Sequence, residues 1–287
     1  MGKDILMQIE ENSRGFSKGQ RLIARYITEN YDKAAFMTAG RLGKTVGVSE
    51  STVVRFATEL GYDGYPGMRK AMQEMVRSRL TSVQRIAVAK DMLDGSNVLK
   101  YVMSSDIDKL QGTLEELDRQ SFEEAVNAIE NAGHLYIVGM RSSAALASFM
   151  AFYMNFLVDN VRLIHDTTAN EVYEQIMHIG PGDVYVGISY PRYSSSSLKA
   201  MRFAKSRGAA VVALTDNQTS PFAAIADIKL YAKSEMVSFV DSLVGPLSLI
   251  NALIVAVAAR KQETLAQTFN YLEGLWSEYE VFTTDKS

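Results

Sequence analysis

The sequence predicts an all-α domain followed by an α/β domain, the second built on a five-stranded parallel sheet in a flavodoxin-type three-layer arrangement. Two observations predict this fold class. Residues 1–80 place apolar side chains at helical spacing and contain no strand-like run. Beyond residue 122, short apolar runs rich in Val, Ile and Tyr alternate with helical stretches. This alternation is typical of βαβ units, and the runs occupy residues 134–140, 161–165, 184–189, 209–216 and 228–233.

The same patterns divide the chain of 287 residues into three parts. We expect a DNA-binding domain of the helix-turn-helix type over 1–80, a helical linker over 81–106 and the α/β domain over 107–287. The first part has 13 Lys and Arg against 9 Asp and Glu, a net charge of +4 within a chain whose total is −3. This basic part is where a contact with nucleic acid is expected.

Composition excludes several chemistries and locations. The chain has no cysteine, which excludes disulfides, thiolate metal sites and cysteine nucleophiles. Charged residues at the start of the chain argue against a signal peptide. Residues 242–259 are nearly uncharged, but Gly245, Pro246 and Asn251 interrupt the run, so we expect a buried helix there instead of a membrane span. A cytoplasmic protein without membrane contact is the resulting expectation.

Residues 39–62 carry the strongest local pattern of the first domain. A short helix over 41–46, a tight turn at Gly47 and a second helix capped by Ser49 and ended by Gly61 predict a helix-turn-helix. An amphipathic hairpin with a solvated outer face is the alternative interpretation. The expected apolar stripe of the second helix consists of Val53, Val54, Ala57 and Leu60.

The opposite face of the second helix offers polar groups to the major groove of double-stranded DNA. We expect base-edge contacts near its N-terminus, from Glu50, Ser51, Thr52 and Arg55. Phosphate contacts, which fix the position of the protein without reading sequence, are expected from Arg41, Lys44, Arg69 and Lys70.

The segment around this pattern resembles the N-terminal domain of the RpiR family of bacterial transcription regulators. The resemblance covers about residues 3–79 and rests on the opening SKGQRLIARYI, the core VGVSESTVVRF and the tail LGYDGYPGMRK. It implies a helical DNA-binding domain that acts in a dimer or a higher oligomer. One departure is Gly43, where such domains often carry alanine, and this glycine is expected to weaken the first helix by about 1 kcal/mol.

Two of the predicted strands end in loops rich in hydroxyl groups. Ser142 and Ser143 follow the run 134–140, and a serine-rich loop from Ser189 to Ser194 follows the run 184–189. In parallel sheets ligands bind beyond the carboxyl ends of the strands, where helix N-termini favour an anion such as phosphate. Arg141 and Arg192 could add charge-assisted hydrogen bonds, and His165 could line the same pocket. Alternatively, the serines simply cap helices.

The second half, about residues 107–287, resembles the SIS (sugar isomerase) domain that usually follows an RpiR-type DNA-binding domain. Ser142 and Ser143 match its first glycine-serine loop, Ser189 and Ser194 match the outer members of its SxSGxT motif, and TDNQTSPFAAIAD matches a further segment. The resemblance implies that these hydroxyls hold a phosphosugar. Arg192 stands where the motif has glycine, so either this arginine binds the anion directly or the effector differs from a simple phosphosugar.

Two further functions compete with ligand-controlled regulation. A sugar-phosphate isomerase would need a base, for which His165, Asp166 and Glu171 are candidates, but the DNA-binding domain makes catalysis superfluous. A domain that serves only oligomerisation would not need hydroxyl-lined loops. The histidines match no metal-ligand spacing, and no catalytic residue, metal or cofactor is expected. The predicted function is therefore a DNA-binding transcriptional regulator, a homodimer or homotetramer whose operator affinity responds to a small sugar-derived, phosphorylated effector.

Overall fold

A computed structural model describes residues 5–79, 81, 83–86, 97–165, 171–236 and 238–281. The chain forms two compact units. The N-terminal unit comprises residues 1–105 together with residues 235–241, and the C-terminal unit comprises residues 106–234 and 242–287. Residues 235–241, which lie inside the predicted third part of the chain, thus group with the N-terminal unit.

The N-terminal unit is built from helices over residues 5–79, whereas its later segment contains an isolated antiparallel bridge between Met236 and Asp241. Its core is formed by large apolar side chains that the helices bring together, among them Ile23, Ile27, Leu42, Phe56 and Met68. The helices are α1 (Ile5–Asn12), a 3-10 turn (Ser13–Gly15), α2 (Lys18–Glu29), α3 (Tyr31–Ala34), α4 (Ala39–Val46), α5 (Glu50–Glu59) and α6 (Gly64–Arg79).

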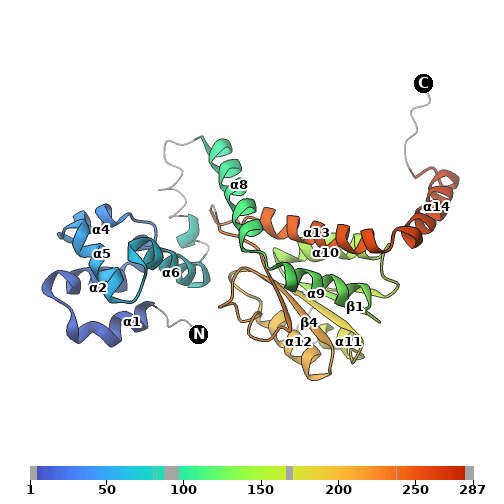
Figure 1. Ribbon diagram of the computed structural model, residues 1–287, viewed down its shortest axis with the longest axis horizontal. Coiled ribbons are helices and arrows are strands. Elements are labelled where there is room, and N and C mark those ends of the chain that lie inside the picture. The colour runs from blue at the N-terminus through green and yellow to red at the C-terminus, as the bar shows by residue number, and fades with distance from the viewer. Residues whose placement is uncertain are drawn as a thin grey trace. The chain divides into compact units, whose positions relative to one another are not determined.

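The C-terminal unit is a three-layer α/β domain (Figure 1). The long helix α8 (Val98–Glu116) begins in the N-terminal unit and from Asp106 onward belongs to the C-terminal unit. The strands of the domain are β1 (Leu135–Gly139), β2 (Val161–Ile164), β3 (Val184–Ile188), β4 (Ala210–Thr215) and β5 (Ile228–Tyr231). Its helices are α9 (Arg119–Glu130), α10 (Ser143–Met154), α11 (Glu171–Ile176), α12 (Ser195–Ser206), α13 (Val244–Arg260) and α14 (Gln262–Glu278).

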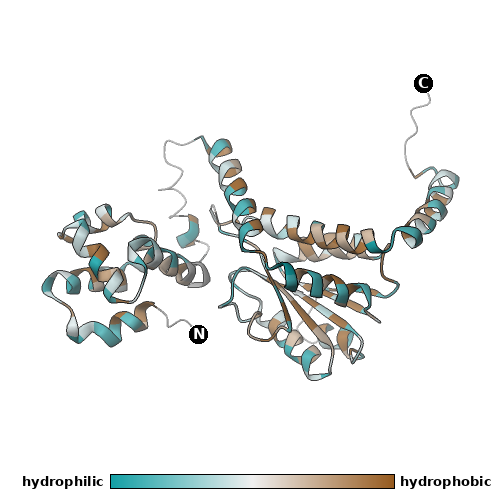
Figure 2. Cartoon of the chain, viewed as in Figure 1, coloured by the Kyte–Doolittle hydropathy of each residue, from teal (hydrophilic) through white to brown (hydrophobic). Residues whose placement is uncertain are grey.

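The sheet is fully parallel and has the strand order β2-β1-β3-β4-β5, which confirms the predicted fold class. Helices α9, α10 and α13 cover one face, and α11 and α12 cover the other (Figure 1). Every residue of β1 and β3 is buried, so neither strand has a solvent-exposed face, and the strands of the sheet are largely brown in Figure 2. The strand order reverses between β1 and β3, which creates a topological switch point at their carboxyl ends.

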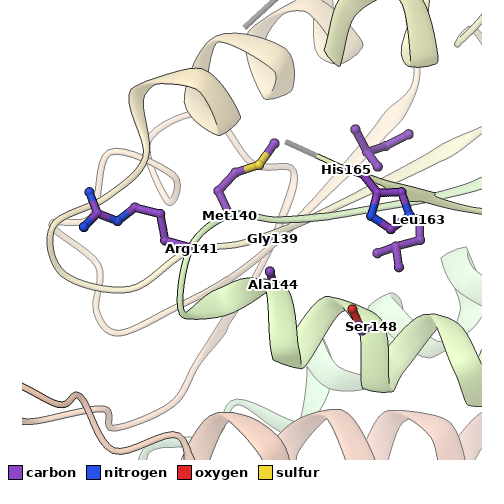
Figure 3. A pocket seen from close by; sticks show the side chains of 8 residues that line it. Gly139, Met140, Arg141, Ala144, Ser148, Leu163 and His165 are labelled. Atoms are coloured by element: carbon purple, nitrogen blue, oxygen red, sulfur yellow. The ribbon is translucent and has the colours of Figure 1, made fainter. Parts of the chain in front are cut away.

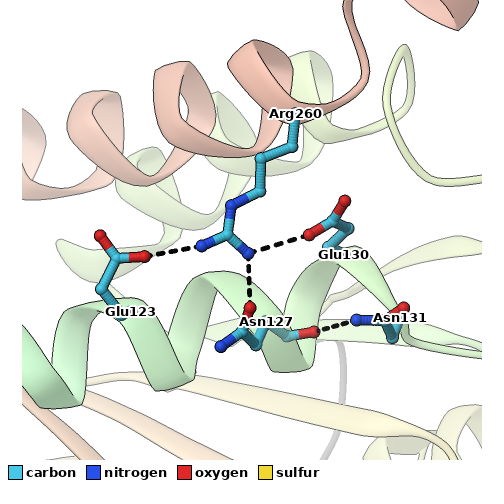
Figure 4. Close-up of polar contacts among 5 residues, drawn as sticks. All are labelled: Glu123, Asn127, Glu130, Asn131 and Arg260. Atoms are coloured by element: carbon cyan, nitrogen blue, oxygen red, sulfur yellow. Dashed lines mark hydrogen bonds and ion pairs between the residues drawn. The ribbon is translucent and has the colours of Figure 1, made fainter.

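Helix α13 accounts for the apolar run 242–259. Its inner side packs Leu249, Ile250, Leu253 and Val257 into the core beside the sheet. At its C-terminus, Arg260 binds Glu123, Asn127 and Glu130 of α9 and so fixes α13 to its neighbour (Figure 4). In the described part of the chain, no single helix has the length and hydropathy to span a membrane. Helices α13 and α14 meet that test only together, and they are bent by 97° at their junction.

Candidate functional site

Helices α4 and α5 form the predicted helix-turn-helix. Gly47 ends α4 in the left-handed conformation, with a φ of 78°, and its N–H donates to the carbonyl of Gly43. Ser49 caps α5, because its hydroxyl accepts a hydrogen bond from the backbone N–H of Thr52 at 3.3 Å. Turn and cap therefore lie at the predicted residues and orient α5 as a candidate recognition helix.

Gly43 has the opposite role from the one its helix propensity suggests. A Cβ atom at this position would lie 2.8 Å from the carbonyl oxygen of Val48 and 3.3 Å from the backbone carbon of Ser49. The turn passes so close to α4 that only glycine fits. The expectation that this glycine merely weakens the helix is therefore wrong: close packing of the turn outweighs the propensity cost of about 1 kcal/mol.

Replacement of Gly43 by alanine is expected to lower the free energy of unfolding of the N-terminal unit by about 1–2 kcal/mol. The new methyl group would push the turn away from α4. Gly40→Ala is the matched control, because a Cβ there would meet only the flexible carboxylate of Glu50, at 3.1 Å. Urea titration followed by circular dichroism measures both variants, and equal stability of the two would contradict this role of Gly43.

The two faces of α5 differ partly from the predicted division. Val53 and Ala57 are fully buried, as expected, and Phe56 is buried with them. Val54, predicted as part of the apolar stripe, is 37% exposed. Leu60 is buried as predicted, so Val54 is the one wrong member of the stripe. Its place is taken by Phe56, whose ring packs against Phe16 with the ring centroids 5.1 Å apart.

The predicted DNA-contacting residues lie on α4, α5 and α6. Ser51 and Arg55 are exposed on α5, whereas Thr52 is half-buried and its hydroxyl lies 2.8 Å from that of Ser49. Glu50 is also exposed, with its carboxylate beside Gly40. The four predicted phosphate contacts are Arg41, Lys44 and Lys70, which are exposed, and Arg69, which is half-buried.

The tail that follows α5 is a structural anchor. Gly61 and Gly64 adopt left-handed conformations, with φ values of 89° and 66°, which allow the chain to turn sharply into α6. The hydroxyl of Tyr62 donates to Gln8 at 2.7 Å, and that of Tyr65 donates to the carbonyl of Met37 at 2.9 Å. Burial raises the pKa of Tyr65 to about 12, so this phenol remains a donor. Tyr62 thus ties the turn between α5 and α6 to α1, and Tyr65 ties α6 to the segment before α4.

In the C-terminal unit, Gly139 brings the end of β1 against the start of α10. A Cβ atom at Gly139 would lie 2.4 Å from the carbonyl oxygen of Ser143 and 2.9 Å from the Cβ of Ala147. No side chain fits in this space. The close approach places the loop of Arg141 and Ser142 directly at the carboxyl edge of the sheet.

A cavity of about 540 Å³ opens at this edge, beside the ends of β1 and β2 (Figure 3). Its described lining includes two of the predicted ligand residues, Arg141 and His165, together with Ser148 of α10. Figure 3 shows the side chain of Arg141 directed away from His165. His165 is held through its backbone, because its N–H and its carbonyl both bond to the side chain of Gln175. Asp166, the predicted alternative base, lies outside the described residues.

The predicted serines lie beside the ends of β1 and β3 and are not among the described residues that line this cavity. Ser142 is exposed, while Ser143 and Ser189 are buried. The Ser189 hydroxyl accepts the N–H of Ser194 at 3.4 Å, and Ser194 caps α12 by accepting the N–H of Ser197 at 3.2 Å. Ser194 therefore acts as a helix cap, and Ser189 supports the loop that leads into it.

Two arginines at this edge have left-handed backbones. Arg141 has a φ of 56° and Arg192 a φ of 68°, which is uncommon for residues other than glycine. Arg192 stands where glycine is usual in the phosphate motif. The loop thus keeps a backbone suited to glycine while presenting an exposed cationic side chain.

A polar network behind the β3 loop was not predicted from the sequence. The hydroxyl of Tyr193 donates to the buried carboxylate of Asp216 at 2.7 Å, and Thr215 bonds to both Asp216 and Ser220. Its members come from the loop after β3 and from the TDNQTSP segment after β4, so only the fold brings them together. The network ties the β3 loop to the end of β4.

Two buried hydroxyls near this loop have no hydrogen-bond partner within the described structure, those of Tyr190 and Ser197. Burial, and then the charge of Asp216, raises the pKa of Tyr190 well above its usual value, so its phenol is protonated. No group of acidic or histidine side chains in the described ranges is arranged to hold a metal ion. His134 instead bonds to Asp183 at 2.8 Å, at the opposite edge of the sheet.

A helix-turn-helix unit followed by a switch-point α/β domain defines the protein as a DNA-binding regulator with a sugar-isomerase-like domain. Comparison with known families agrees. Residues 3–79 match the helix-turn-helix domain of the rpiR family, and residues 128–256 match the SIS domain.

Two solved structures illustrate the similarity. The sugar isomerase domain of an RpiR transcription factor from Sphaerobacter thermophilus is 30% identical, with a TM-score of 0.59, covering 62% of this chain and 99% of that chain. The NanR protein of Vibrio vulnificus, complexed with ManNAc-6P, is 22% identical, with a TM-score of 0.61, covering 97% of this chain and 99% of that chain.

Curated relatives extend the similarity along the chain. A helix-turn-helix transcriptional regulator from Caldanaerobacter subterraneus is 25% identical and HexR from Pseudomonas aeruginosa is 26% identical, covering 94% and 90% of this chain and 95% and 90% of those proteins. The chain belongs to the RpiR family, and it is a transcriptional regulator.

Proposed function

We propose that this regulator binds a phosphosugar or a related sugar-derived anion at the carboxyl edge of its sheet. The observation that carries the proposal is the convergence of two serine loops at the switch point, each leading into a helix N-terminus. Backbone N–H groups and the helix dipole favour an anion there. The hydroxyls of Tyr190 and Ser197 retain unused hydrogen-bonding capacity beside the same loops. The similar NanR protein, bound to ManNAc-6P, supports this class of effector.

The cavity beside β1 and β2 suits the sugar portion of such a ligand. Ser148 and His165 offer polar groups on its wall, while Leu163 and Ile164 offer apolar contact. Arg141 borders both the cavity and the loop of Ser142. Arg192 supplies a second cation from the β3 loop, and we assign to it a direct contact with the anionic group.

The other half of the proposed function is recognition of a double-stranded operator by α5. Ser51 and Arg55 are exposed on the face opposite to the buried Val53, Phe56 and Ala57, as a helix in the major groove requires. Arg55 is assigned to a base edge. The cations of α4 and α6 are assigned to phosphates, with Glu50 and Thr52 at the edge of the contact.

A homodimer or a homotetramer is proposed from the outer surface of α10 and α13. These adjacent helices hold no charged residue before Arg260. Phe152 and Val255 nevertheless remain 60% and 58% exposed. A helix that is apolar all round is ordinarily buried, so a second copy of the chain is the expected cover. Oligomerisation would set the spacing between recognition helices.

Control of operator affinity requires that the effector bind two arrangements of the protein with different affinities. The effector would stabilise one arrangement of the paired chains, and the spacing of the two α5 helices would follow. Reciprocally, operator DNA would change the affinity for the effector by the same factor.

The double variant Ser189→Ala and Ser194→Ala is expected to abolish the response to effector while leaving operator affinity unchanged. It removes a buried acceptor and the α12 cap together. Thermal-shift screening with phosphosugars, ManNAc-6P among them, followed by a gel-shift titration, measures both properties. Ser206→Ala, at the far end of α12, is the control.

A retained response in the double variant would place the ligand elsewhere. Absence of stabilisation of the unaltered protein by every phosphosugar would favour a purely oligomerising role for the SIS domain. The two outcomes are distinct, because only the second concerns the native chain.

A further inference from the structure

One segment of the α/β half of the sequence belongs structurally to the DNA-binding half. The chain leaves the sheet at the end of β5, enters the N-terminal unit at Glu235 and leaves it again at Asp241. We name residues 235–241 the strap, of which the structure describes all but Val237. Ser234 before it and Ser242 after it belong to the C-terminal unit.

The strap begins at the proposed effector edge. All five strands are parallel, so the carboxyl ends of β1, β3 and β5 lie at one edge of the sheet. Only residues 232–234 separate the end of β5 from the strap. On its other side, the Ser242 hydroxyl donates to Asp106 at 2.7 Å, directly before α13. Movement at this edge therefore reaches the strap through a very short length of backbone.

Within the N-terminal unit the strap closes on itself and is held by two contacts with other segments. Met236 and Asp241 form an antiparallel bridge that closes the strap on itself. The side chain of Met236 packs against the apolar core that also contains the helix-turn-helix. Asp241 Oδ1 lies 2.7 Å from Nη1 of Arg85, in the helical turn 83–86 that follows α6.

The Arg85–Asp241 pair differs from an ordinary surface ion pair in its burial. The side chain of Arg85 is 3% exposed and that of Asp241 is 16% exposed. In the Arg25–Glu29 pair of the same unit, the side chains are 76% and 56% exposed. Loss of one partner from a buried pair leaves an uncompensated charge, whereas loss from an exposed pair changes little. The buried pair can thus hold two segments together that are 156 positions apart in sequence.

From these contacts we infer that the strap is the element that transmits effector binding to the helix-turn-helix, with the Arg85–Asp241 pair as its clasp. This inference rests on the proposed function. An effector that binds clasped and unclasped forms with different affinity shifts the balance between them, and operator affinity follows. Without the clasp, the two halves would still bind their own ligands but would no longer influence each other.

The first test needs no effector. Hydrogen exchange, read by mass spectrometry on the full chain, compares the native protein with Asp241→Asn, and Glu29→Gln is the matched control. In the Asp241→Asn variant, backbone amide hydrogens are expected to exchange at least tenfold faster, both in the strap and in the core segments that Met236 contacts. Asp241→Glu, which keeps the charge, should restore much of the protection. If Asp241→Asn exchanges at the same rates as the native protein, the Arg85–Asp241 pair does not hold the strap and the inference is overturned.

The second test measures coupling. Operator affinity is titrated with and without ManNAc-6P, or whichever phosphosugar stabilises the native protein. In the native chain the ligand is expected to change affinity by a factor of about 5 or more, and in Asp241→Asn by less than twofold, while thermal shift still shows ligand binding. An equal response in both proteins would overturn the inference. If no phosphosugar binds the native chain, the proposed function fails, and the exchange experiment alone decides whether the clasp holds the strap.

Discussion

Gly139→Ala is expected to lower the free energy of unfolding of the C-terminal unit by about 3 kcal/mol. The added methyl group would lie 2.4 Å from a backbone carbonyl oxygen of α10, a neighbour that cannot move without displacing the helix. The end of β1 and the start of α10 both border the proposed effector site. We therefore expect the variant to lose effector binding as well as stability. Chemical denaturation followed by circular dichroism measures the first effect and thermal shift the second.

Gly180→Ala is the control for this variant, because a Cβ there would meet no atom within 4 Å. Hydrogen exchange should localise the damage of Gly139→Ala to β1 and α10. Stability equal to that of the Gly180 variant would show that the strand and helix can separate freely, contrary to the packing described above.

Arg55→Ala is expected to weaken binding to a specific operator by about 1–3 kcal/mol, on the order of tenfold to a hundredfold in affinity. The exposed guanidinium of Arg55 is the strongest base-reading group on the outer face of α5. The operator fragment is first selected from random DNA with the native protein and then titrated in a gel-shift experiment. Arg25→Ala, which removes an exposed arginine from α2, is the control.

Lys44→Ala separates base reading from charge. A phosphate contact carries no sequence information, so this variant should weaken specific and non-specific binding alike and lower the salt slope by about one. Arg55→Ala should instead reduce the difference between the affinity for the specific operator and the affinity for non-specific DNA. Unchanged operator affinity of Arg55→Ala would remove this residue from the recognition surface.

Local turn chemistry made the N-terminal unit predictable. The residue types of Gly47 and Ser49 alone predict a turn and a helix cap, and the structure has the turn and the cap at these residues. Gly43 was misjudged because helix propensity describes a residue within its own helix, whereas its requirement comes from Val48 in the turn beyond. Val54 was misplaced because the burial of Phe56 depends on core residues distant in sequence, Phe16 among them.

The sheet was predictable for a different reason. Continuous apolar runs such as that of β3 indicate strands buried on both faces, and parallel connectivity follows from the helices between them. The polar arrangement at the sheet edge was only partly predictable. Ser189 and Ser194 are neighbours in sequence, but Tyr193 and Asp216 meet through the fold. The pairing of Arg85 with Asp241 could not be predicted for the same reason, because the sequence around neither residue indicates which residue it contacts.

The left-handed backbone of Arg192 brings the stability of the fold and the binding of the effector into conflict at one residue. Glycine would relieve a conformational cost of about 1–2 kcal/mol at this position but would remove the cation assigned to the effector. On the proposed function, the protein keeps this conformational cost at residue 192 because the arginine places a cation beside the effector.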